Sequence, residues 1–238
     1  MTDCINTKIN LLLAAAGGQP SSDLGHALAG EAARLRNDLP PALGAQAGIG
    51  LDPAAVERAL GSLGADGRSD FGAPGYQGLL WVVGPGGTIG ELTDALGGVA
   101  ARLGDLIDPA RSAAVAGTEE IFLQGDGPLA GMYAVRRRPG DSYEHFHDFW
   151  RLEHTKLSMY IPGFRYRQLH AVGYASRAAA ERAGVAVADI DGVIEYFFDD
   201  IQYQVDMTRL DNFPEIYADE KNFIDHDLST FSYVRLFD

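Results

Sequence analysis

The stretch LAGMYAVRRRPGDSYEHFHDFWRLEHTKLSMY, residues 129–160, decides the fold class because it joins an apolar strand to a long amphipathic helix. The apolar run at its start, bounded by arginines and a proline, is typical of a buried strand over 129–139. Asp141 or Ser142 can cap a helix over 143–160, since short polar side chains accept hydrogen bonds from the first turn. The stretch is therefore one strand–helix unit.

This unit belongs to an order of strand, helix, strand, strand, helix, strand that occurs twice. After a turn-rich joint at 125–128, strands are expected at 129–139, 163–172, 192–200 and 231–237, with helices at 143–160 and 203–221. Before it, strands are expected at 5–15, 41–51, 79–84 and 113–124, with helices at 24–39 and 88–107. Such a βαββαβ unit is ferredoxin-like and leaves one sheet face uncovered. A tandem copy supplies the partner sheet, so we predict an α+β chain of two units, 1–126 and 127–238.

Local signals add detail to the first unit. Ser22 or Asp23 can cap the first helix, and Thr88 with Glu91 has the spacing of a capping box. An extra helix is expected over 52–63, with Asp52 as its N-cap. A Gly-rich loop follows at 64–78.

Composition and charge disfavour several classes of partner. A formal net charge of −14 argues against nucleic acid and against anionic membrane surfaces. The single cysteine, Cys4, cannot form an internal disulfide and fits a reducing cytoplasm, where we expect the protein. No apolar run approaches the length of a membrane-spanning helix. Residues 8–18 loosely imitate a secretion signal, but they are equally suited to a first strand.

The two units differ in chemistry. Four of the 23 aromatic residues and one of the six histidines precede Gly127, and all the others follow it. Alanine and glycine dominate the first unit and offer little chemistry. We therefore expect the first unit to be a scaffold and the second to carry the site.

The helix 143–160 concentrates histidines beside an aromatic face. At about 100° per residue, His154 falls at the edge of this face, His147 lies beside it and His145 points away to solvent. An imidazole in an apolar pocket can exchange protons near neutral pH. The alternative is a core histidine bonded to a backbone carbonyl. The expected face consists of Tyr143, Phe146, Phe149, Trp150, Glu153 and Leu157.

Two carboxylates occupy positions that the pattern predicts to be buried. Glu153 lies within the aromatic face and Glu195 within the strand run VIEYFF, where an unpaired charge is costly. We expect them to join the histidines in a polar cluster, although ion pairs with Arg165, Arg167 or the arginines at 136–138 are an alternative. On the strand 163–172, Tyr166 shares a side with His170 and either faces a pocket or fills space.

Four pieces of the second unit together resemble the EthD family of the dimeric α/β-barrel superfamily. They are RRRPGDSYEHFHDFWRLEH (136–154), IPGFRYRQLH (161–170), DGVIEYFFDD (191–200) and YADEKNFID (217–225). The first unit matches only in its order of elements, like a degenerate copy. The resemblance implies functional roles for His154, Tyr166, Glu195 and Asp225, whereas His147 is outside the family pattern.

The resemblance also implies that the two antiparallel sheets pack into an α/β barrel with helices outside. Family members usually build this barrel by dimerising, and fused halves would build it within one chain; a further homodimer stays open. The implied substrates are small and often aromatic or polyketide-like. Relatives include decarboxylases, dehydratases, lactone isomerases, cofactor-free monooxygenases and haem enzymes, so the fold does not select the reaction.

Other signals are weaker. GPGGTIGE (84–91) lacks the lysine and glycine spacing of phosphate loops, and no His-x-x-x-His pair occurs, although His147, His154 and Glu195 could share a metal. No G-x-S-x-G elbow is present, and Cys4 is a poor nucleophile candidate. We expect no metal and no cofactor.

Our hypothesis is a cofactor-independent lyase or isomerase, of decarboxylase, dehydratase or cyclase type, acting on a hydrophobic aromatic or polyketide-like carbonyl compound. His154 moves the proton with help from His147, Tyr166 binds the developing oxyanion and Glu195 orients the imidazole. A haem enzyme with His154 or His170 as axial ligand and a non-catalytic binding protein are the alternatives. The expected pocket walls are Trp150, Phe146, Tyr196 and Phe198.

Overall fold

Every segment with the apolar pattern of a strand forms one in the computed structural model, which describes residues 5–60 and 75–237. Cys4 and most of the expected Gly-rich loop lie outside these residues. Bounds differ from the expected ones by a few residues, as is usual at element ends. The strands are β1 Ile5–Leu13, β2 Gly44–Gly50, β3 Gly78–Pro85, β4 Ala113–Leu123, β5 Leu129–Val135, β6 Tyr166–Ala171, β7 Gly192–Phe198 and β8 Thr230–Leu236.

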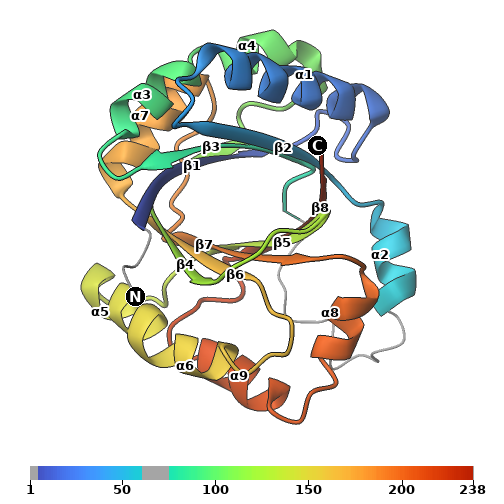
Figure 1. Ribbon diagram of the computed structural model, residues 1–238, viewed down its shortest axis with the longest axis vertical. Helices are drawn as coiled ribbons and strands as arrows, with labels where there is room; N and C mark the ends of the chain where they lie inside the picture. Colours follow the sequence, from blue (N-terminus) through green and yellow to red (C-terminus); the bar gives the residue numbers. More distant parts are fainter. Residues whose placement is uncertain (1–4, 61–74, 238) are drawn as a thin grey trace.

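The strands pair antiparallel throughout and close into a barrel in the order β1-β3-β2-β8-β5-β7-β6-β4 (Figure 1). Within this circle the first half has the order β4-β1-β3-β2 and the second half β8-β5-β7-β6, the same ferredoxin-like order twice. The halves join where β2 pairs with β8 and β4 pairs with β6. The predicted fold class is confirmed, and the division near Gly127, in the β4–β5 connection, remains our proposed boundary between the units.

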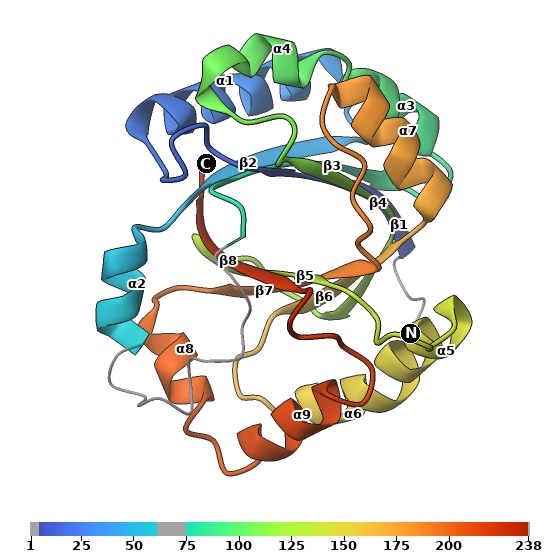
Figure 2. The ribbon, with the colours of Figure 1, turned by 180° about the vertical axis from the view of Figure 1, so that it is seen from behind.

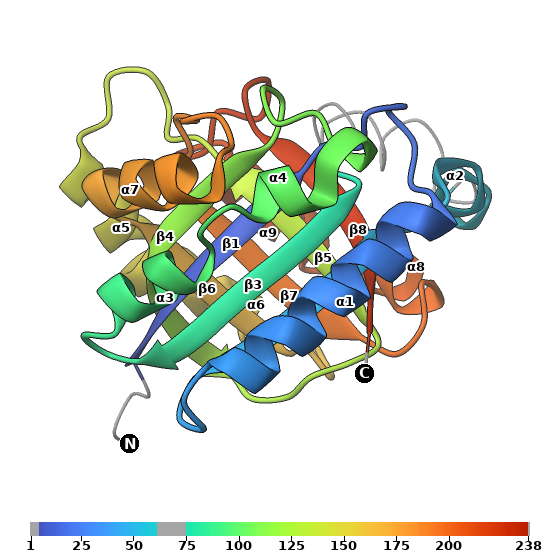
Figure 3. The ribbon, with the colours of Figure 1, turned by 90° about the horizontal axis from the view of Figure 1, so that it is seen from above.

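Helices cover the outside of the barrel in two groups, as Figures 1 and 2 show from opposite sides. Figure 3 shows the group over the first-half strands: α1 Ser22–Asp38, α3 Ile89–Ala95, α4 Val99–Leu103 and α7 Gly173–Ala183. The group beside the second half comprises α2 Pro53–Leu60, α5 Tyr143–Phe149, α6 Thr155–Ser158, α8 Gln202–Met207 and α9 Phe213–Glu220.

Helix α7 is an element that the sequence pattern does not predict. It follows β6 in the second half but packs on the first-half sheet, where Ala175, Ala179 and Ala183 join the core beneath α1 and α4. Small side chains allow this close approach. Because alanines give only a weak apolar pattern, the periodicity of the sequence does not predict this helix. The second half therefore supplies part of the first half's cover.

Several expected helix signals differ in detail. The N-cap of α1 is Ser21, one residue earlier than expected, while Ser142 caps α5 as predicted. Thr88 stands at the N-cap of α3 but does not cap it, because its hydroxyl donates to the Pro85 carbonyl. The expected helix 88–107 is broken between Leu96, the C-cap of α3, and Gly98, the N-cap of α4, whose φ of +70° is not helical. The expected helix 203–221 is likewise two helices, α8 and α9.

Three apolar clusters follow from the alternation of strand side chains. One lies under α1, α3, α4 and α7, one lies between the second-half sheet and its helices, and one fills the barrel. The barrel interior also holds charge: Lys8 and Glu195 are 1% and 0% exposed. Residues adjacent on one strand thus face different cores, which decides where each predicted site residue lies.

Candidate functional site

The helix that carries the histidines contains a π-turn. Between α5 and α6, residues Trp150–His154 are π-helical, and the Thr155 amide donates to the carbonyl of Trp150, five residues earlier. The Thr155 hydroxyl donates to the same carbonyl at 2.9 Å. Such one-turn π segments insert an extra residue into a helix and often occur at functional sites.

The inserted residue changes which side chains face the sheet. A regular helix would place Glu153 and Leu157 inward, as the wheel predicts, but the π-turn moves each inward position one residue later. His154 and Ser158 are therefore buried, at 2% and 4% exposure. Glu153 is exposed and pairs with Lys156 at 2.7 Å, so its expected burial was wrong. His145 is solvent-exposed, as predicted.

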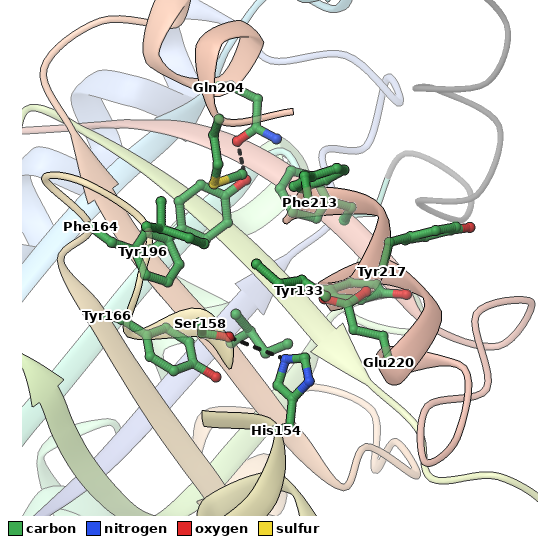
Figure 4. A pocket seen from close by; sticks show the side chains of 15 residues that line it. Tyr133, His154, Ser158, Phe164, Tyr166, Tyr196, Gln204, Phe213, Tyr217 and Glu220 are labelled. Carbon is green, nitrogen blue, oxygen red and sulfur yellow. Dashed lines mark hydrogen bonds between the residues drawn. The ribbon is translucent and has the colours of Figure 1, made fainter. Parts of the chain in front are cut away.

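A cavity of about 50 Å³ lies between the second-half sheet and the helices α6, α8 and α9 (Figure 4). Its walls are mainly aromatic and aliphatic, with a few polar groups. The lining residues are Tyr133, His154, Ser158, Ile161, Phe164, Tyr166, Ile194, Tyr196, Gln204, Met207, Phe213, Ile216, Tyr217, Glu220 and Phe231. This combination of apolar walls and convergent polar groups is typical of a small-molecule site.

His154 is held against this cavity by a carboxylate. Its Nδ1 lies 2.9 Å from Oδ2 of Asp219 on α9, and its Nε2 lies 3.4 Å from the Ser158 hydroxyl. Burial lowers the pKa of His154 and outweighs the opposing effect of Asp219. The imidazole is therefore neutral near pH 7, with the proton on Nδ1 and a lone pair on Nε2.

Tyr166 presents its hydroxyl to the same cavity from β6. The oxygen accepts hydrogen bonds from Trp150 Nε1 at 2.9 Å and from Gln168 Nε2 at 2.8 Å. With both lone pairs engaged, the hydroxyl proton is directed away from these partners. Burial raises the pKa of Tyr166, so the group is a neutral donor near pH 7.

His147 and His170 form a separate buried pair behind Trp150. Their Nδ1 atoms are 2.7 Å apart, and His170 Nε2 lies 2.9 Å from the Gln168 side-chain oxygen. Burial lowers the pKa of His147 to about 4 and that of His170 to about 2, with nearby charged groups adding to both shifts. Because neither histidine lines the cavity, the structure does not bring His147 to His154. Through Gln168, the pair instead supports the Tyr166 hydroxyl.

Glu195 does not reach His154, contrary to the predicted orienting role. Strand alternation turns Glu195 into the barrel, while its neighbour Tyr196 faces the helices and lines the cavity. Within the barrel, Glu195 pairs with Lys8 and accepts from Asn10 Nδ2 at 2.6 Å. Lys8 also bonds Glu119 at 2.9 Å. Asp219 takes the place beside the imidazole that the sequence interpretation gave to Glu195.

Other expected site residues have packing or turn roles. Phe146, Trp150 and Phe198 belong to the apolar cluster around the cavity but do not line it. Asp225, which the family resemblance suggested, accepts hydrogen bonds from the amides of Asp227 and Leu228 in a turn. It therefore shapes the loop before β8.

Glu220 is a cavity residue that the sequence analysis missed. Burial raises its pKa to about 8, with a further contribution from the charge of Asp219. The carboxyl is therefore largely protonated near neutral pH and can donate a hydrogen bond. Only its place in the motif YADEKNFID, beside Asp219, was visible in the sequence.

No helix of residues 5–60 and 75–237 is both long and apolar enough to cross a bilayer. In the same ranges, no three His, Cys, Asp or Glu side chains cluster as a metal site would require.

Comparisons with known proteins point to the same half of the chain. Residues 138–227 match the EthD domain, and no curated protein sequence matches the chain. This match confirms the resemblance of the second unit to that family.

Solved structures resemble the whole barrel. A candidate chlorite dismutase is 15% identical, with a TM-score of 0.54 over 100% of this chain and 96% of that chain. A candidate monooxygenase from Lactobacillus acidophilus NCFM is 13% identical, with a TM-score of 0.51 over 98% and 94%. Another from Fusobacterium nucleatum subsp. nucleatum ATCC 25586 is 9% identical, with a TM-score of 0.53 over 100% and 94%. At these identities the likeness concerns the fold alone.

Proposed function

We propose that this EthD-domain barrel is a small-molecule enzyme, a cofactor-independent lyase or isomerase that moves a proton on a hydrophobic carbonyl compound. The observation that carries the proposal is the His154–Asp219 pair at the edge of an apolar cavity. A carboxylate that accepts from Nδ1 fixes the tautomer and aims the Nε2 lone pair outward. This is the arrangement of a general base.

The remaining polar groups suit the oxygen of a carbonyl substrate. When His154 removes a proton beside a carbonyl, negative charge develops on the oxygen. The Tyr166 hydroxyl, already fixed by Trp150 and Gln168, can donate to that oxygen, and the protonated Glu220 is a second donor. Donors held in place before the reaction stabilise such an oxyanion most effectively.

The cavity volume limits the substrate. About 50 Å³ holds a few water molecules, below the roughly 300–1,000 Å³ of pockets for drug-sized ligands. Small carbonyl compounds fit this space. An aromatic or polyketide-like substrate requires α8 and α9, which supply the outer wall, to move away from the sheet.

Solvent deuterium exchange tests the elementary step without knowledge of the natural substrate. The protein is incubated in D₂O with small cyclic ketones, and loss of the proton beside the carbonyl is followed by NMR. We expect exchange above the buffer rate, reduced at least about 100-fold by His154→Ala, because general bases contribute roughly that much. A Glu195→Gln variant that folds as well as the unaltered protein should retain deuterium exchange, since Glu195 faces the inside of the barrel.

Two outcomes would remove the proposal. Exchange that is undiminished in a folded His154→Ala variant would exclude this base. Tight binding of the ketones without any exchange would favour a binding protein that carries small molecules without altering them.

The residues do not fit the haem alternative. The volume beside His154 is far below that of a macrocycle, and both ring nitrogens of His154 have polar neighbours, Asp219 and Ser158. His170, the other suggested ligand, faces His147 and Gln168 and does not line the cavity. A Soret band in the visible spectrum of the purified protein would contradict this conclusion.

A further inference from the structure

Ser158, which the proposed reaction does not use, extends the His154–Asp219 pair to a row of three side chains. Its Oγ lies 3.4 Å from His154 Nε2, and His154 Nδ1 lies 2.9 Å from Asp219 Oδ2. Ser158 is 4% exposed and lines the cavity with His154, and Figure 4 shows its hydroxyl between His154 and Tyr166. A hydroxyl, an imidazole and a carboxylate in this order form the relay that activates serine nucleophiles.

We propose that Ser158 is a nucleophile that takes the acyl group of small apolar carboxylic esters, giving the cavity an esterase activity. The proposal rests on the His154–Asp219 pair of the proposed function but not on its lyase or isomerase reaction. Three elements of the fold position the relay: the π-turn supplies His154, α6 supplies Ser158 and α9 supplies Asp219.

The contacts of Ser158 differ from those of a structural serine. Hydroxyls in helices usually donate to a backbone carbonyl one turn earlier. Thr155 does so toward the Trp150 carbonyl at 2.9 Å, and Ser176 bonds the Ala116 carbonyl at 3.2 Å. The described contact of Ser158 Oγ is instead the basic nitrogen of His154. A separation of 3.4 Å is long for a hydrogen bond but within the range of such pairs before substrate binds.

The overall reaction is hydrolysis of the ester, with water as the second reactant. Ser158 Oγ attacks the ester carbonyl carbon while its proton passes to His154 Nε2, and Asp219 stabilises the resulting imidazolium. The bond from the acyl carbon to the leaving oxygen breaks, and His154 returns the proton to the departing alcohol. Water then attacks the acyl-serine with His154 as base, which releases the acid and restores Ser158.

The walls suit a short acyl chain. Tyr166 and Glu220 would donate hydrogen bonds to the oxyanion, and apolar side chains such as Ile161, Ile194 and Ile216 surround the space for the acyl group. A volume of about 50 Å³ admits only a few heavy atoms, so acetyl and propionyl esters are the expected class.

Covalent labelling tests Ser158 directly. The full chain is treated with methanesulfonyl fluoride, a serine reagent about as small as the expected substrates, and the adduct is located by intact-mass measurement and peptide mapping. We expect one adduct, on Ser158, with displacement of fluoride. Ser158→Ala should abolish it, while Ser176→Ala, the matched change at a buried serine outside the cavity, should leave it unchanged. Asp219→Asn should slow labelling about 10- to 100-fold, and hydrolysis of methyl acetate should follow the same order.

The pH dependence distinguishes an activated serine from a merely accessible one. Labelling should accelerate as the pH rises through the lowered pKa of His154, because only the neutral imidazole accepts the proton. His154→Ala should remove this dependence.

The labelling and deuterium-exchange experiments can fail independently, so they test the serine nucleophile and the proposed function separately. An adduct on Ser158 with no ketone exchange would refute only the lyase or isomerase proposal. Ketone exchange without labelling, or labelling that maps to another residue, would overturn the serine nucleophile. Because the mapping uses the unaltered chain, this result does not depend on whether a variant folds.

Discussion

Replacing Lys8 with methionine tests whether the buried charge cluster is structural. Lys8 Nζ lies 2.9 Å from Glu119 Oε1 and also pairs with Glu195, and the three side chains are at most 2% exposed. Methionine has a similar length but no charge, so it leaves two carboxylates in the barrel without their cation. Breaking a buried ion pair by removing one partner costs about 3–5 kcal/mol. For a chain of this size, that corresponds to a decrease in Tm of roughly 6–20 °C.

The free-energy cost of Lys8→Met should depend on pH, and the pKa of Glu119 predicts the direction of this dependence. Burial alone would raise the pKa of Glu119, but the charge of Lys8, hydrogen bonds from Asn6 and Lys8 and the charge of Arg167 together outweigh burial and hold the pKa below its usual value. A carboxylate with a lowered pKa stabilises the fold above its unfolded pKa and loses that contribution as the pH falls through the folded value. Without Lys8, burial favours the protonated form of Glu119, so the free-energy cost of the substitution should become smaller as the pH falls from 7 to 5. The difference between the two proteins therefore shrinks on acidification.

Urea denaturation of both proteins at pH 7 and pH 5 measures the two free energies of unfolding. Lys156→Met is the matched control, because its pair with Glu153 is 65% and 58% exposed and is expected to contribute less than about 1 kcal/mol. A loss below about 1 kcal/mol for Lys8→Met, or a loss that grows at pH 5, would refute the reasoning.

Three further predictions concern the site and its support. Asp219→Asn should lower the rate of ketone exchange at least about 10-fold, because the His154 tautomer loses its anchor; a full rate in the folded variant would exclude that role. Gly192→Ala should cost about 1–3 kcal/mol in urea denaturation, because a Cβ would lie 2.5 Å from Trp150 Cζ3 and 2.8 Å from the Leu169 carbonyl oxygen; an unchanged midpoint would contradict this packing. The free energy of unfolding should fall as the pH drops from 6.5 toward 4, by up to about 1.4 kcal/mol per pH unit for each of His147 and His170. The reason is that both histidines become protonated in the unfolded chain at a higher pH than in the folded protein. A profile that is flat, or that His147→Phe leaves unchanged, would contradict this prediction.

Part of the site could be predicted from the sequence. His154 and Tyr166 were chosen from the helix pattern and the family resemblance, and both line the cavity. The alternation of side chains along a strand also argued against one predicted role. Glu195 and Tyr196 are adjacent on one strand, so they cannot both face the same pocket. The lysine within the first strand, Lys8, was a second buried charge that could have been paired with Glu195.

Other features have no local signal. The π-turn at Trp150–His154 exchanges Glu153 for His154 on the buried face and buries Ser158 beside the partly buried Leu157, and a helical wheel with uniform spacing cannot represent it. The partnership of His154 with Asp219 joins residues 65 positions apart on two helices. Their contact depends on how both helices pack on the sheet.

The sequence by itself determined the eight strands and the repeated order of strands and helices, because the period of apolar side chains is a local property that records which face each segment buries. It also predicted that the second half carries the candidate site, since histidines and aromatic residues are concentrated there. Only the tertiary structure decided which polar groups meet. Closure of the barrel turns Glu195 toward Lys8, and the packing of α9 on the π-turn brings Asp219 to His154, because contacts between distant segments depend on the relative placement of whole elements and not on the spacing within any one of them.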